Sequence, residues 1–191
     1  MEAVKETSVP YSNRRTPISE AIMNLYLIRH AEAADLEAGD DHDDAERPLT
    51  DNGKVQCAAL AAALLARGVS LNQVVSSPLL RARQTVEALL EHWPAPAPEQ
   101  LTCKALAPDG RAKKITRFLL GLSGENVALV GHMPDLAEYA GWLVGAKKAQ
   151  VNIAKAGVAF IRFDGSPDKG EGALVWLITP EWCENAGAES H

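Results

Sequence analysis

Short apolar runs alternate along this chain with segments of helical periodicity, and this alternation constrains the fold more than any other feature. The apolar runs predict buried strands at 24–29, 72–77 and 125–132, with a weaker strand at 100–104. Segments with helical spacing predict helices from Thr50 to Gly68, from Pro78 to about Trp93, over 111–122 and from Pro134 to Val144. Strands that are separated by helices are typical of a parallel sheet.

The pattern changes near the C-terminus, where two apolar runs are separated only by a polar, glycine-rich stretch. Runs 157–163 and 172–178 predict an antiparallel hairpin. The whole pattern predicts an α/β fold, a three-layer α/β/α sandwich with a mostly parallel central sheet and a C-terminal antiparallel hairpin. With 191 residues, of which 47% are apolar, one domain at 23–191 is expected. Residues 1–22 are interpreted as an N-terminal extension, either dispensable and disordered or the product of a misplaced start.

Composition excludes several classes of protein. The chain has 19 basic and 25 acidic residues, a net charge of −6, which argues against a general nucleic-acid binder. No stretch approaches the 18 or more consecutive apolar residues of a membrane span. The three cysteines are too few and too widely separated for a disulfide framework, so a reduced, cytoplasmic compartment is expected.

Basic side chains follow three of the predicted strands at the point where each strand ends. Arg29 and His30 end the first, Arg81 lies one turn into the helix after the second, and His132 ends the fourth. Since ligands of such sheets bind at the carboxyl ends of the strands, these four side chains are expected to meet. Buried positive groups need an anion among them, and phosphate or sulfate matches the forked donors of arginine.

The same cluster supplies a nucleophile. A neutral imidazole can attack phosphorus, while the cationic neighbours stabilise charge on the equatorial oxygens. Either histidine taken alone is also readily explained as a packed or capping residue. The combination of an Arg-His pair, a Ser-Ser-Pro segment with its arginine and a Gly-His pair, each after a buried strand, favours the phosphoryl site.

Four segments of the chain resemble the histidine phosphatase superfamily, and within it the small SixA-type phosphohistidine phosphatases. They are LIRHAEA (27–33), ERPLTDNG (46–53), SSPLLRARQT (76–85) and LVGHMPDL (129–136). The resemblance covers the chain from about 25 to 145, and TPEW (179–182) is also similar to relatives. In the third segment the family's arginine corresponds to Arg81 rather than to Arg83.

The resemblance implies a role for each matching residue. His30 would be the nucleophile that accepts the phosphoryl group, and Arg29, Arg81 and His132 would form the rest of the phosphate pocket. Arg47, in the RPLT segment, resembles a further arginine at the edge of the SixA-type pocket; its alternative is an ordinary loop residue. No metal and no cofactor are implied.

Two features depart from the superfamily's commonest pattern. Ala31 follows the Arg-His pair where many members have glycine, which bears on the width of the pocket. The stretch between Arg81 and His132 is short, whereas larger members place there a long insertion that covers the site and carries an acidic proton donor. An open pocket favours a phosphoryl group carried by a protein. Phosphohistidine also suits weak acid assistance, because it expels an imidazole whose conjugate acid has a pKa of about 6.5.

Two carboxyl groups are candidates for a proton donor, Glu32 beside the nucleophile and Asp109 in APDG. Asp109 has a competing interpretation as the cap of the helix near 111, and Glu32 as a solvated loop residue or one that orients a histidine. The acidic run DDHDD (40–44) also invites a metal-site interpretation through His42. Consecutive loop residues rarely converge on one ion, so an acidic lip beside the pocket is favoured.

The sequence therefore predicts a metal-independent phosphatase that hydrolyses protein phosphohistidine through a covalent phosphohistidine intermediate. A protein bearing phosphohistidine is its expected partner, and neither nucleic acid nor a membrane is expected. Two alternatives stay open. One is a phosphomonoesterase for small molecules that uses the same pocket, and the other is a phospho-ligand-binding regulatory module with little turnover.

Overall fold

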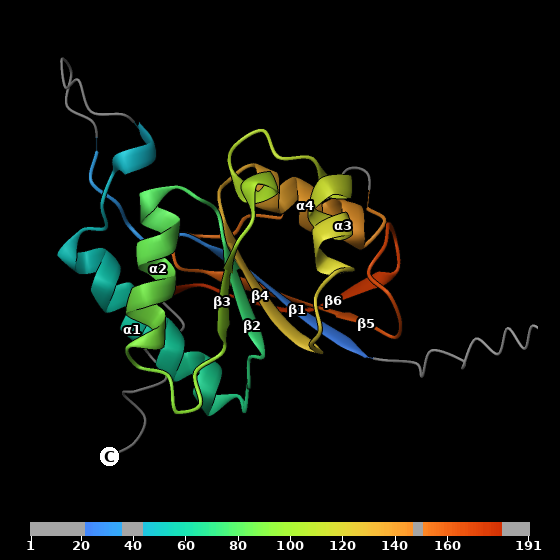
Figure 1. Ribbon diagram of the computed structural model, residues 1–191, viewed down its shortest axis with the longest axis horizontal. Coiled ribbons are helices and arrows are strands. Elements are labelled where there is room, and N and C mark those ends of the chain that lie inside the picture. Colours follow the sequence, from blue (N-terminus) through green and yellow to red (C-terminus); the bar gives the residue numbers. More distant parts are fainter. Residues whose placement is uncertain (1–21, 36–43, 147–150, 181–191) are drawn as a thin grey trace, which may run out of the picture.

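A six-stranded mixed sheet forms the centre of the protein in this computed structural model, which describes residues 22–35, 44–146 and 151–180 (Figure 1). The strands are β1 (Met23–Arg29), β2 (Gln73–Ser76), β3 (Glu99–Thr102), β4 (Asn126–Gly131), β5 (Val158–Phe163) and β6 (Gly172–Ile178). The helices are α1 (Asp51–Ala66), α2 (Leu80–Leu90), α3 (Ala112–Leu119) and α4 (Asp135–Leu143), with short 3-10 turns η1 (Asp44–Glu46) and η2 (Lys104–Leu106).

The strand order is β3-β2-β4-β1-β5-β6, and the first four strands in that order run parallel. β5 pairs antiparallel with β1, and β6 pairs antiparallel with β5. Parallel neighbours need a crossover, and the helices of the predicted alternation supply it, whereas the last two strands are joined directly. The predicted α/β fold, with its mostly parallel sheet and C-terminal hairpin, is confirmed.

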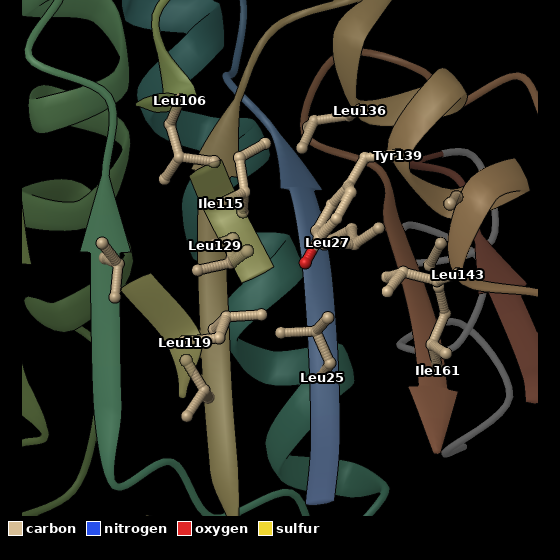
Figure 2. Close-up of a cluster of buried hydrophobic side chains, with 14 of the residues drawn as sticks. Leu25, Leu27, Leu106, Ile115, Leu119, Leu129, Leu136, Tyr139, Leu143 and Ile161 are labelled. Atoms are coloured by element: carbon tan, nitrogen blue, oxygen red, sulfur yellow. The ribbon is translucent and has the colours of Figure 1, made fainter. Parts of the chain in front are cut away.

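Helices cover both faces of the sheet and create two apolar cores. α1 and α2 cover one face of the sheet, where they pack on the residues of β1 and β4 that point toward them. α3 and α4 cover the other face (Figure 1). Figure 2 shows the second core, where Leu25 and Leu27 of β1 and Leu129 of β4 contact Leu119 and Tyr139 from the helices. Each leucine buried in this way contributes about 1.5–3 kcal/mol to folding.

Local signals place most boundaries within two or three residues. Thr50 caps α1 as predicted, since its Oγ1 accepts a hydrogen bond from the backbone N–H of Gly53 at 3.0 Å. Gly68 follows the end of α1 with a φ of +69°, a conformation that glycine adopts without strain. α2 begins at Leu80, two residues after Pro78, and ends at Leu90, before the predicted Trp93.

The N-terminal extension predicted at 1–22 lies almost entirely outside the described residues, as do His42 and most of the acidic run. None of the helices in the described ranges combines the length and apolar content that a membrane crossing requires.

Candidate active site

The register of the sheet brings the two predicted histidines together. Arg29, the last residue of β1, pairs with Gly131, the last residue of β4, so His30 and His132 leave the sheet side by side. The backbone N–H of His30 still donates to the carbonyl of Gly131 at 3.0 Å. The two imidazole rings lie 5.1 Å apart between centroids, and their residues are 8% and 3% exposed. The juxtaposition expected from the strand ends is therefore present.

The hydrogen bonds of His30 fix its tautomer. Its Nδ1 lies 2.7 Å from the carbonyl oxygen of Ala31. A carbonyl oxygen can only accept, so Nδ1 carries the proton, and in the neutral ring Nε2 keeps its lone pair. The backbone of the next residue thus leaves Nε2 as the nucleophilic nitrogen.

His132 makes its hydrogen bond through the other ring nitrogen. Its Nε2 lies 2.8 Å from Oγ of Ser77, a fully buried hydroxyl that also accepts the backbone N–H of Leu79 at 3.3 Å. The hydroxyl can donate its own proton to Nε2, and Nδ1 is then the protonated nitrogen. Nδ1 is buried and has no hydrogen-bond partner among the described residues.

Two arginines complete the cluster, and in each of them the Nε–H is buried without a hydrogen-bond partner among the described residues. Arg29 donates from Nη1 to the carbonyl of Ile153 at 3.1 Å. Arg81, only 5% exposed, donates from Nη1 to the carbonyl of Asp44 at 2.6 Å and from Nη2 to its Oδ2 at 3.0 Å. The Nε atoms of both arginines are buried without a partner in the part of the chain that the structure describes.

The unpartnered nitrogens have a physical consequence. A buried donor without an acceptor costs about 1–3 kcal/mol, and more when it is charged. Arg29 and Arg81 each carry one such donor, and Nδ1 of His132 is a third when it holds the ring proton. Hydrogen bonds to an anion with several acceptor oxygens would satisfy donors of this kind.

The electrostatic environment keeps both imidazoles neutral. Burial lowers the pKa of His30 to about 4. The hydrogen bond to the carbonyl of Ala31 opposes this shift, and repulsion from Arg81, Arg29 and Lys155 adds to it. Burial also lowers the pKa of His132 to about 3, with repulsion from His30 and Arg81. At neutral pH the pocket therefore offers an unprotonated imidazole beside two guanidinium groups.

These pKa values predict a pH-dependent stability. The unfolded chain protonates its imidazoles near pH 6.5, whereas the native protein does so only near pH 4 for His30 and pH 3 for His132. The unfolded state binds more protons in this window, so the free energy of unfolding should fall from pH 7 to pH 5, by up to about 1.4 kcal/mol per pH unit for each imidazole.

Denaturant unfolding at pH 7, 6 and 5 measures this loss. His30→Gln should reduce the slope, while His92→Gln, at an exposed position after α2, should leave it unchanged. An unaltered slope in His30→Gln contradicts the prediction.

Asp44 links two arginines at the rim of the pocket. Its Oδ2 accepts from Arg81 and its Oδ1 accepts from Nη1 of Arg47, both at 3.0 Å. The hydrogen bond from Arg47, followed by that from Arg81, lowers the pKa of the Asp44 carboxyl. Arg47 also lies 3.5 Å from Oδ1 of Asp35 and donates to a backbone carbonyl, so the structure places it at the edge of the site, in an ion-pair network.

The two candidate proton donors, Glu32 and Asp109, lie in different parts of the structure. Glu32 points to the start of α1, where its Oε1 accepts from Thr50 Oγ1 at 2.7 Å and its Oε2 from Asn52 at 3.0 Å. These hydrogen bonds, Thr50 first, lower the pKa of Glu32. Asp109 instead lines a cavity between η2 and α3.

The capping interpretation of Asp109 is wrong. The N-cap of α3 is Arg111, which makes no side-chain capping hydrogen bond. Asp109 lies two residues earlier, in a turn where its own φ is +66°, so it does not occupy the N-cap position, from which a side chain accepts hydrogen bonds from the first N–H groups of the helix.

The sequence did not predict the roles of three residues at the site. Ser77 ends the second predicted strand and Asp44 ends the acidic run, and only their tertiary contacts show which side chains they hold. Lys155 lies in the loop before β5, near enough to lower the pKa of His30, and the adjacent Ala156 N–H bonds to the carbonyl of His30 at 3.3 Å. No local pattern marks Lys155, because it reaches the site from about 125 residues along the chain.

Sequence comparisons identify relatives over most of the chain. Residues 25–102 match the histidine phosphatase superfamily, branch 1. An uncharacterized protein of Picosynechococcus sp. is 34% identical over 169 residues, which cover 84% of this chain and 98% of that protein. Phosphohistidine phosphatase SixA of Escherichia coli is 29% identical over 161 residues, covering 83% of this chain and 94% of SixA.

Solved structures give the same picture. The protein histidine phosphatase SixA, complexed with tungstate, matches with a TM-score of 0.71 and 26% identity over 83% of this chain and 97% of that one. A phosphoglycerate mutase from Bacillus anthracis matches with a TM-score of 0.66 over 88% of this chain and 98% of its own, at 14% identity, a likeness of fold alone.

Proposed function

Because this chain belongs to the histidine phosphatase superfamily and is a phosphatase, we propose that it hydrolyses phosphohistidine on a protein through a phosphorylated His30. The observation that carries the proposal is the state of His30, with Nδ1 bonded to the carbonyl of Ala31 and a pKa lowered to about 4. An imidazole held neutral, with Nε2 as its free nitrogen, is the form that attacks phosphorus.

The reaction has two steps. In the first, Nε2 of His30 attacks phosphorus, and the bond from phosphorus to the substrate imidazole breaks. Its electron pair stays on that imidazole, which takes up a proton from solvent. The phosphoryl oxygens accept hydrogen bonds from Arg29, Arg81 and His132, whose unpartnered nitrogens support this assignment. In the second step, water attacks phosphorus and gives up a proton to solvent, the bond from phosphorus to Nε2 of His30 breaks with its electron pair returning to the ring, and inorganic phosphate leaves.

The surroundings of the pocket support a phosphoryl group carried by a protein. Between Arg81 and His132 the chain contains only the rest of α2, then β3, η2, α3 and β4 with their short connections, so this stretch carries no long insertion. The leaving imidazole also needs little acid assistance. The relative named phosphohistidine phosphatase supports this substrate, and the tungstate complex of SixA supports a tetrahedral oxyanion, such as phosphate, as the occupant of the pocket.

Other residues have secondary places in the proposal. Arg47 contributes to substrate binding at the edge of the pocket, where its ion pair with Asp44 holds it. The assignment of Glu32 or Asp109 as proton donor stays a prediction; the lowered pKa of Glu32 makes it a carboxylate at neutral pH, the form that cannot donate. The buried free thiols of Cys57 and Cys103 support a reduced, cytoplasmic setting.

Trapping the intermediate tests the proposal. Turnover of a substrate labelled on its phosphoryl group, quenched with alkali, should leave label on the protein that is stable to base and released by acid, as expected of phosphohistidine. Peptide mapping should place the label on His30. Absence of label in wild-type protein that still releases phosphate contradicts the covalent mechanism. Faster turnover of sugar phosphates or nucleotides than of a phosphohistidine peptide contradicts the substrate.

A further inference from the structure

A cavity of about 580 Å³ lies between η2 and α3, outside the cluster formed by His30 and His132. Four basic side chains line it, Lys104, Arg111, Lys114 and Arg117, together with the single carboxylate of Asp109. All four basic residues are exposed, and none has an ion-pair or side-chain hydrogen-bond partner in the described part of the chain. The lining therefore carries a formal charge of 4 − 1 = +3.

The positive charge of the cavity lining is opposite in sign to the net charge of the whole protein, which is −6. A local excess of one sign in a concave surface concentrates ligands of the opposite sign and speeds their association. The cavity is thus suited to an acidic ligand.

The walls of the cavity are fixed by the fold. The turn that ends at Gly110 is tight, because a Cβ at this position would lie 2.0 Å from the carbonyl oxygen of Ala105. At its base, the backbone N–H of Cys103 donates to the carbonyl of Ser76 at 2.9 Å. On the opposite side, α3 is anchored in the core by Ile115 and Leu119. The basic side chains therefore extend from a rigid support.

The cavity adjoins the site of phosphoryl transfer. The segment between β3 and α3 passes over the end of the sheet where the parallel strands finish (Figure 1). The carbonyl of Leu106, in η2, lies 3.6 Å from a Cβ built on Gly131, the residue before His132. Ser76, bonded to the cavity base, precedes the Ser77 that holds His132. A single η2 turn thus separates the cavity from the strand end that delivers His132.

The lining also has an apolar part that fits one kind of partner. Phe118, Pro108 and Ala105 line the same cavity as the basic side chains and contribute carbon surface to it. An apolar centre within a charged rim is the usual composition of a protein–protein contact. An acidic polypeptide surface with one apolar side chain at its centre matches both parts.

We propose that this cavity docks an acidic segment of the protein that carries the phosphohistidine. The inference rests on the proposed function and names the partner of the same site. Docking over η2 holds the phosphorylated side chain beside the pocket, so the basic lining raises the affinity for the acidic partner and leaves the chemical step unchanged.

Two phosphohistidine peptides of equal length test the proposal, one with four glutamates around a leucine and the other with four glutamines in their place. At low salt, the wild-type protein should show a kcat/KM at least about tenfold higher for the glutamate peptide, because the KM for this peptide is lower. At high salt this preference should disappear. The double variant Lys114→Glu/Arg117→Glu should lose it at any salt concentration while hydrolysing the glutamine peptide normally.

Lys113→Glu is the matched control, since Lys113 is exposed on the same helix and does not line the cavity. Its preference should equal that of the wild type. An unchanged preference in the double variant overturns the docking site while leaving the phosphatase intact, and so does an equal loss in Lys113→Glu. A wild-type protein that hydrolyses neither peptide overturns the proposed function, and the partner with it.

Discussion

Replacing His30 by alanine is expected to lower kcat by about 10⁴-fold or more, because the variant has no atom to accept the phosphoryl group. The three unpartnered nitrogens of Arg29, Arg81 and His132 remain in this variant, so it should still bind tungstate or phosphate. Loss of turnover with retained oxyanion binding is the signature expected for a nucleophile rather than for a binding residue. Phosphate release and tungstate titration by calorimetry measure the two properties.

His92→Ala provides the comparison for this variant. His92 is exposed just beyond the end of α2, so its replacement changes a histidine without touching the site. It should keep wild-type activity. If His30→Ala retains more than about a hundredth of the wild-type rate, the covalent mechanism is wrong, since alanine cannot replace a nucleophile.

Replacing Arg81 by alanine is expected to lower kcat/KM by about 10²–10³-fold. The Arg81 guanidinium lies buried with its Nε unpartnered, while both terminal nitrogens are held by Asp44. Removing it takes a charged donor from the phosphoryl oxygens and leaves the Asp44 carboxylate paired with Arg47 alone. Lysine should not restore activity, because one ammonium cannot hold Asp44 and a phosphoryl oxygen in the same planar geometry. Steady-state kinetics and tungstate affinity measure the loss.

Arg83→Ala is the control. Arg83 lies in the same SSPLLRAR segment but is exposed on α2, whereas Arg81 is buried. Its replacement should change kcat/KM less than about twofold, as expected of an exposed substitution. Comparable losses in both variants contradict the assignment of the phosphoryl contact to Arg81.

The sequence was most informative where the physical signal is local. Thr50 caps α1 through a contact three residues away, and the apolar runs form strands because their periodicity is a property of adjacent residues. For Asp109 the local pattern predicted a helix cap, and this prediction was wrong. The chain turns at Asp109 with a positive φ, and α3 begins only after Arg111. A side chain that can cap does so only if the backbone presents it to free N–H groups, and spacing alone does not determine that.

The sequence by itself determined that Arg29, His30, Arg81 and His132 follow the ends of buried strands, and topology rules then placed them at one edge. The tertiary structure decided how each of them is held. The hydrogen bonds of Arg81 to Asp44, the contact of His132 with Ser77 and the nearness of Lys155 to His30 depend on contacts between segments far apart in the chain. Desolvation and Coulomb interactions act through space, so the neutral state of the histidines is a property of the folded pocket and of no single segment.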